Sequence, residues 1–244
     1  MKNELYQSCT LCPRECHADR LSGKKGACGE NSMLRVGRAA LHMWEEPCIS
    51  GTRGSGTVFF SGCSLGCIFC QNRELSSGGL GKEISEERLA EIFLELQEQG
   101  AANINLVTGE HFVPGILEGL TLAKEQGLTL PVVYNSSGYE KPETIRLLKD
   151  SVDIWLPDFK YWDDELGLRF SGVADYRERA VKAIEEMVRQ TGACVFDEEG
   201  YLRKGVVVRH LLLPGHVKNS REVLRYLHGT YGNQIYISIM SQYT

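Results

Sequence analysis

The sequence predicts an α/β protein in which parallel strands alternate with helices. From residue 57 onward, short apolar runs recur, and amphipathic helical segments separate them. Strands covered on both faces are typically near-continuous apolar runs, and their alternation with helices implies right-handed βαβ units. A doubly wound open sheet and an incomplete barrel both fit. We expect a partial (β/α)6 barrel of parallel strands over residues 56–244, preceded by an irregular cysteine-rich N-terminal extension over residues 1–55.

The expected elements follow from hydrophobic periodicity and from helix start and stop signals. The strands are predicted at 57–60, 104–107, 131–135, 152–156, 205–215 and 235–240, and the helices at 84–100, 113–126, 141–149, 175–188 and 220–228. In the first helix Leu89, Phe93 and Leu96 share one face, and Ser85 can cap its start. Asp175 and Glu178 form a capping-box pair that opens the fourth helix.

Composition excludes several broad classes of function. The net charge of -5 and the absence of a basic run argue against a nucleic-acid-binding protein. The N-terminus lacks the apolar core of a secretory signal, and no apolar run is long enough to cross a bilayer. Nine cysteines without an export signal indicate a reducing, cytoplasmic compartment, where they act as thiolates for metal or chemistry. The sequence stops directly after the sixth strand, as expected if the native chain continues past Thr244.

Three cysteines follow the first strand of the barrel in the spacing C-x3-C-x2-C. They are Cys63, Cys67 and Cys70, and the glycines at 62 and 66 allow the backbone to curl around them. Iron–sulfur cubanes usually take four thiolates, so three leave one iron open, which is typical of a catalytic site. The alternative is a zinc site completed by Cys48 or a histidine.

This spacing, with Phe69 before the last cysteine, resembles the signature of the radical S-adenosylmethionine superfamily. The resemblance implies a four-iron, four-sulfur cluster whose open iron binds S-adenosylmethionine. Reductive cleavage then gives a 5′-deoxyadenosyl radical that abstracts hydrogen from a substrate. It also implies that Phe69 lies against adenine and that a low-potential donor of the flavodoxin or ferredoxin type supplies the electron.

Polar residues at later strand ends extend the resemblance. Thr108-Gly109-Glu110 resembles the Gly-Gly-Glu motif of the superfamily, in which the acidic group binds the amino group of the cosubstrate. Arg209 lies where relatives bind the cosubstrate carboxylate; the alternative is an internal salt bridge with Asp158. His210 should point to the opposite face of the strand from Arg209.

Two further strand ends resemble those of glycyl-radical-enzyme activases. They place Asn135, Ser136 and Asp158 beside the cofactor, either as hydrogen-bonding groups or as turn formers. Lys160 follows the same strand end as Asp158.

The N-terminal extension holds a second group of cysteines: Cys9, Cys12, Cys16 and Cys28 in the spacing C-x2-C-x3-C-x11-C. Four ligands make a closed metal site, which zinc and a second iron–sulfur cluster both fit. Free thiols in a flexible leader are the alternative. This extension resembles that of a branch of radical enzymes related to pyruvate formate-lyase activating enzyme.

The sequence therefore predicts a radical enzyme. Its substrate is a protein, a peptide side chain or a small molecule, and no nucleic acid or membrane is involved. The contrasting hypothesis is a non-catalytic scaffold or binding protein that uses zinc at both cysteine groups.

Overall fold

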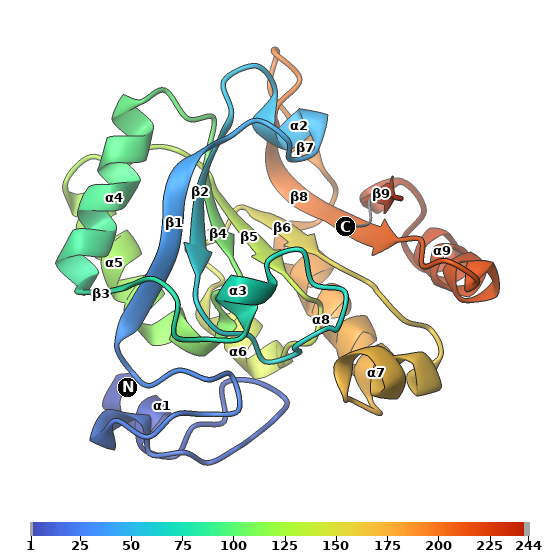
Figure 1. Ribbon diagram of the computed structural model, residues 1–244. Coiled ribbons are helices and arrows are strands. Elements are labelled where there is room, and N and C mark those ends of the chain that lie inside the picture. Colours follow the sequence, from blue (N-terminus) through green and yellow to red (C-terminus); the bar gives the residue numbers. More distant parts are fainter. Residues whose placement is uncertain (1, 242–244) are drawn as a thin grey trace.

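The centre of the molecule is a sheet of parallel strands that follow one another in chain order. The computed structural model describes residues 2–241, and Figure 1 shows the strands side by side. Neighbouring strands in this series pair in parallel throughout, and the sheet does not close into a full barrel. The parallel strands are β2 (Ser55–Phe60), β4 (Ile104–Val107), β5 (Val132–Ser136), β6 (Ile154–Pro157), β8 (Leu202–Leu211) and β9 (Tyr236–Met240). The predicted partial barrel is confirmed.

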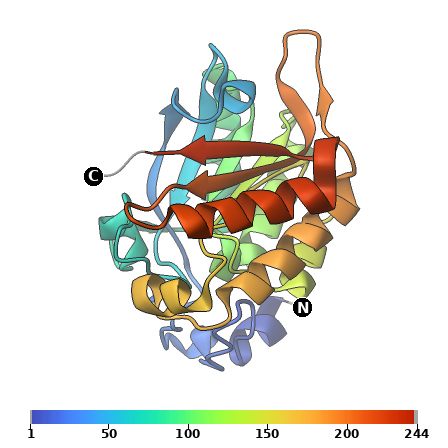
Figure 2. The ribbon, with the colours of Figure 1, turned by 90° about the vertical axis from the view of Figure 1, so that its right-hand side faces the viewer.

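Helices connect these strands and cover one face of the sheet. They are α4 (Glu86–Glu98), α5 (Val113–Glu125), α6 (Pro142–Leu147), α8 (Tyr176–Thr191) and α9 (Val217–Tyr231). Figure 1 shows α4 and α5 packed together on one flank, and Figure 2 shows α9 in front of β8 and β9. Leu89, Phe93 and Leu96 of α4 are fully or almost fully buried, and Ser85 accepts the N–H of Arg88, as predicted.

Three antiparallel strands extend the sheet beyond the predicted set. They are β1 (Leu34–His42), which pairs with β2, β3 (Lys82–Ile84), which pairs with β1, and β7 (Val195–Phe196), which pairs with β8. Strand β1 falls within the extension that was expected to be irregular. Only Leu34 and Val36 of β1 are buried, so its sequence carries little of the alternation that identifies a strand.

Short helices fill the remaining connections. They are α1 (Lys2–Gln7), α2 (Pro47–Ser50), α3 (Arg73–Ser76), α7 (Asp164–Ser171) and the 3-10 turns η1 (Arg20–Ser22), η2 (Glu110–Phe112) and η3 (Gly232–Gln234). The predicted capping pair before α8 is wrong. Asp175 makes no side-chain cap and instead accepts hydrogen bonds from Tyr139 Oη and Arg179 Nε. No helix within residues 2–241 has the length and apolarity needed to span a bilayer.

The pleat of the strands sorts their side chains between two environments. Val132 and Tyr134 of β5 point into the main core beneath the helices, whereas Val133 joins a smaller apolar cluster on the other face. Because side chains alternate along a strand, Asn135 lies on the same face as Val133, one step further toward the strand end. The face of the sheet opposite the connecting helices therefore carries apolar residues in its middle and polar residues toward the carboxyl ends of its strands.

Candidate functional site

A cavity of about 390 Å³ opens at the carboxyl ends of the parallel strands. Parallel α/β folds place their active sites at this edge. The residues predicted for the cluster and the cosubstrate line it, with the exception of Glu110, and so does Lys160: Cys63, Cys67, Phe69, Cys70, Asn135, Ser136, Asp158 and Arg209. The structure thus brings the three-cysteine loop together with the ends of three later strands.

The loop after β2 folds around its own cysteines. Gly62 and Gly66 have φ of +83° and +69°, in the region that favours glycine, which confirms the predicted backbone roles. A side chain at Gly62 is also excluded by space, because a Cβ would lie 2.6 Å from the carbonyl oxygen of Cys28. The N–H of Leu65 lies 3.4 Å from Cys63 Sγ.

The sulfur of Cys67 receives a hydrogen bond from a neighbouring element. Ser171, the last residue of α7, donates its hydroxyl to Cys67 Sγ at 3.0 Å, and Tyr161 Oη lies 2.8 Å from the same hydroxyl. Hydrogen bonds to ligand sulfurs tune an iron–sulfur cluster. Helix α7 was not predicted, so this contact was missed by sequence reasoning.

The donor set fits an iron–sulfur cluster. Burial raises the pKa of the Cys63 thiol to about 11, so this sulfur needs a cation to become a thiolate ligand at neutral pH. Cys63, Cys67 and Cys70 are the only thiols among the residues that line this cavity. They can therefore hold three irons of a cluster and leave the fourth iron open to the cavity.

Arg209 is the centre of a charged network on the wall of the cavity. Its Nε lies 3.0 Å from Asp158 Oδ1, its Nη2 donates to Asn135 Oδ1 at 2.6 Å, and its Nη1 lies 3.5 Å from Glu45 Oε2. Lys160 pairs with the second oxygen of Asp158. Burial alone would raise the pKa of Asp158, but Arg209 and Lys160 hold it below its usual value. The salt bridge with Asp158, weighed above as an alternative, is present.

The end of β1 and the segment between β1 and α2 supply lining residues that sequence reasoning missed. His42, Trp44, Glu45 and Glu46 all face the cavity, and Trp44 is 88% exposed. Burial raises the pKa of Glu45, while Arg209 opposes this effect. The adjacent pair of acids after a tryptophan was the signal available in the sequence.

Phe69 lies on the cavity wall as part of an aromatic cluster. Its ring packs edge-on against Tyr161 and Phe170, with centroid distances of 6.4 and 6.2 Å. His210 points away from the cavity, as predicted, and its Nδ1 lies 2.6 Å from the carbonyl oxygen of Phe159.

The structure does not bring Glu110 into this cavity. Thr108 lines the cavity with φ of +58°, and the chain then turns so that Glu110 is buried behind the cysteine loop. There Glu110 Oε2 accepts the Ser64 hydroxyl at 2.9 Å. Burial raises the pKa of Glu110, and the neighbouring carboxyl of Glu140 raises it further.

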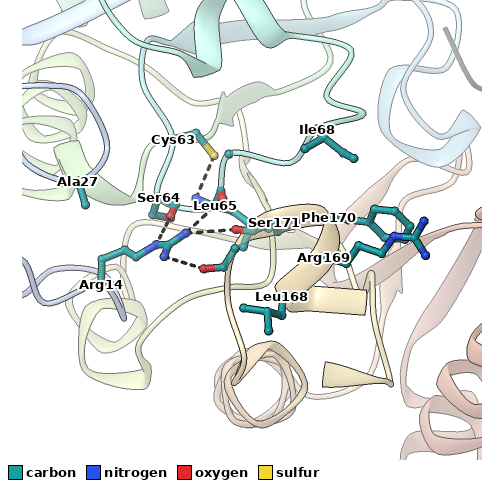
Figure 3. Close-up of a pocket in the computed structure, with 12 residues that line it drawn as sticks. Arg14, Ala27, Cys63, Ser64, Leu65, Ile68, Leu168, Arg169, Phe170 and Ser171 are labelled. Atoms are coloured by element: carbon teal, nitrogen blue, oxygen red, sulfur yellow. Dashed lines mark hydrogen bonds between the residues drawn. The ribbon is translucent and has the colours of Figure 1, made fainter. Parts of the chain in front are cut away.

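A second cavity, of about 520 Å³, lies on the far side of the loop (Figure 3). The N-terminal segment, the loop and α7 form its walls. Arg14 reaches across and donates from Nε to the carbonyl of Ser64 at 2.8 Å and from Nη1 to that of Gly172 at 3.0 Å. A third donor, Nη2, contacts the carbonyl of Ser171 at 3.2 Å.

The remaining cysteines lie away from the first cavity. Cys9, Cys12 and Cys28 are buried in the N-terminal segment, and Cys16 is exposed there. Cys48, considered above as a fourth zinc ligand, packs instead against the small apolar cluster under the site, as does Cys194.

Comparison with known proteins agrees with this architecture. Residues 57–227 match the Radical SAM superfamily. An uncharacterised protein of Methanocaldococcus jannaschii is 28% identical over 247 residues, which cover 98% of this chain and 67% of the relative. The pyruvate formate-lyase-activating enzyme of Clostridium pasteurianum is 26% identical over 175 residues, which cover 70% of this chain and 66% of that enzyme.

A solved structure shares the fold. HydG, a maturase of the FeFe hydrogenase, superposes with a TM-score of 0.51 and 15% identity, over 73% of this chain and 41% of HydG. The chain thus spans about two thirds of the length of these curated relatives and about two fifths of HydG. The chain belongs to the radical S-adenosylmethionine superfamily, which makes it an enzyme and implies a four-iron, four-sulfur cluster and S-adenosylmethionine as its cofactors.

Proposed function

We propose that Cys63, Cys67 and Cys70 hold the cluster and that the adjoining cavity binds S-adenosylmethionine. The observation that carries this proposal is that the three thiols and the polar strand ends line one cavity. When bound, the cluster and cosubstrate supply a 5′-deoxyadenosyl radical that abstracts hydrogen from a substrate. A low-potential flavodoxin or ferredoxin in the cytoplasm provides the electron.

The charged network gives the cavity groups that match an amino acid. The guanidinium of Arg209 suits a carboxylate, and the carboxylates of Asp158 and Glu45 suit an ammonium group. Asn135 and Ser136 add neutral hydrogen-bonding groups to the same wall. The existing ion pairs hold these side chains in position, so a bound cosubstrate exchanges some of these contacts for its own.

We further propose that the substrate is a peptide or protein, as for an activating enzyme. The similarity to the pyruvate formate-lyase-activating enzyme supports this class. The exposed indole of Trp44 on the cavity wall supports it too, because exposed aromatic side chains are enriched where proteins bind other chains.

The cluster assignment is tested by product analysis. After anaerobic reconstitution, dithionite and S-adenosylmethionine should yield 5′-deoxyadenosine and methionine with the parent protein. Cys67→Ala should reduce the yield to background, whereas Cys194→Ala, which removes a thiol outside both cysteine groups, should retain it. Equal yields from the Cys67 variant and the parent would overturn the proposal, and a colourless protein that carries only zinc would favour a scaffold.

The substrate class is tested by isotope transfer. A peptide containing α-deuterated glycine should pass deuterium into 5′-deoxyadenosine if the enzyme resembles an activase. Cosubstrate cleavage without deuterium transfer from any glycine peptide or candidate glycyl-radical protein would reject the activase class and leave the radical chemistry in place.

A further inference from the structure

Two of the four N-terminal cysteines meet around one glycine. A Cβ at Gly26 would lie 3.3 Å from Cys16 Sγ and 3.5 Å from Cys28 Sγ. Arg20, whose Cδ would lie 3.8 Å from the same Cβ, donates from Nη1 to Cys9 Sγ at 3.6 Å. Cys9, Cys16 and Cys28 therefore lie around Gly26 and Arg20, and Cys12 is buried in the same segment.

The backbone on both sides of Cys16 has an unusual, strained conformation. Glu15 and His17, on either side of Cys16, have φ of +39° and +51°, a region that non-glycine residues seldom occupy. Two hydrogen bonds hold them: the N–H of Glu15 donates to the carbonyl of Cys12, and that of His17 donates to the carbonyl of Cys9, both at 3.0 Å. Such strain persists where the surroundings fix it and commonly marks functional sites.

We propose that Cys9, Cys12, Cys16 and Cys28 bind a second iron–sulfur cluster. Four thiolates form a closed ligand set, and a four-iron cluster takes one of them on each iron. Zinc has no redox chemistry, whereas an iron–sulfur cluster at this place could exchange electrons with the cluster of the neighbouring radical loop.

This second centre is joined directly to the loop that carries the radical cluster. The N–H of Cys63 donates to the carbonyl of Cys28 at 3.2 Å. A backbone hydrogen bond therefore joins a ligand residue of one proposed centre to a ligand residue of the other. Arg14, between Cys12 and Cys16 in the chain, donates to the carbonyl of Ser64 in the loop (Figure 3). Filling the second centre therefore fixes the back of the radical loop.

Metal counting tests the proposal independently of catalysis. The parent should hold about eight iron and eight sulfide per chain, and a Cys63→Ala/Cys67→Ala/Cys70→Ala variant should keep about four of each. This variant lacks every ligand of the proposed radical cluster, so its iron reports on the second centre whether or not the radical assay succeeds. A Cys48→Ser/Cys194→Ser control should match the parent.

The complementary variant replaces all four N-terminal cysteines with serine. It should lose about half of the iron and sulfide, and the amide of Cys63 should exchange with solvent faster than in the parent. If this variant fails to fold, the iron and sulfide content of the Cys63→Ala/Cys67→Ala/Cys70→Ala variant alone decides whether the second cluster is present. Iron-free protein from the loop variant, or one zinc per chain in place of iron, would overturn the proposal.

Discussion

At the residue scale, Arg209 shows how far strand position alone can locate a functional side chain. Alternation along β8 predicts that Arg209 and His210 face opposite ways, and they do. The sequence could not reveal Glu45 as a partner, because that residue comes from a connection whose path depends on tertiary packing.

Replacing Arg209 should destabilise the protein because it leaves two carboxylates without their shared cation. Arg209→Gln should lower the free energy of unfolding by about 3 kcal/mol and weaken binding of S-adenosylmethionine. Arg209→Lys, which keeps the positive charge, should lose less stability and less affinity. Chemical denaturation and calorimetric titration measure the two effects. Arg203→Gln, in the same strand but with an exposed side chain, serves as the control. Unchanged stability in Arg209→Gln would contradict the network described here.

Glu140 should make stability depend on pH. Burial raises the pKa of its carboxyl to about 8 in the folded protein, against about 4.3 when unfolded. Its contribution is fully present below the unfolded pKa and is lost as pH rises toward 8, because only the unfolded chain releases the proton. Glu140→Gln should flatten the decline in thermal stability between pH 5 and pH 8, and the exposed Glu143→Gln should leave it unchanged. A parallel decline in both variants would refute this pKa assignment.

Glu110 marks a limit of motif reading. The resemblance of Thr108-Gly109-Glu110 to a cosubstrate-binding motif places an acid at the strand end, but it cannot say which way the chain turns there. Thr108 has a left-handed backbone and η2 begins at Glu110, so strand alternation no longer applies and the carboxyl faces Ser64. Irregular backbone after a strand is where side-chain direction is least predictable from sequence.

At the scale of elements, periodicity located the strands of the parallel series and the five longer connecting helices. The elements it missed are short or weakly patterned, such as β1, with two buried residues, and α7, with eight residues. Both matter for the site, because β1 leads into the segment with Trp44 and α7 ends at Ser171 beside Cys67. Their roles come from long-range contacts that local patterns do not encode.

Arg14 links the N-terminal segment to the cysteine loop after β2 and to the end of α7. It should therefore affect how firmly the loop holds its cluster. It donates to carbonyls of the loop and of the end of α7. Arg14→Met should therefore lower the free energy of unfolding by about 1–2 kcal/mol, and the visible absorbance of the cluster should be lost faster when a chelator is added. Lys25→Met, an exposed neighbour in the same segment, provides the matched control. Equal rates of cluster loss in the two variants would argue against a bracing role for Arg14.

At the scale of the whole molecule, the open parallel sheet explains why residues far apart in sequence share one cavity. Every strand of the series ends at the same edge, and the pleat directs alternate side chains inward. The sequence was sufficient to predict this edge and the loop that follows β2. It was not sufficient to predict the packing of the N-terminal segment against the back of that loop, which depends on contacts such as Cys28 with Cys63.

The most direct test of the central claim is electron paramagnetic resonance of the reduced protein with and without S-adenosylmethionine. Binding at an open iron of the loop cluster predicts a changed spectrum when the cosubstrate is added to the parent, and no such change in Cys67→Ala. A spectrum from the parent that is identical with and without the cosubstrate would contradict the claim that the cavity beside Cys63, Cys67 and Cys70 is where it binds.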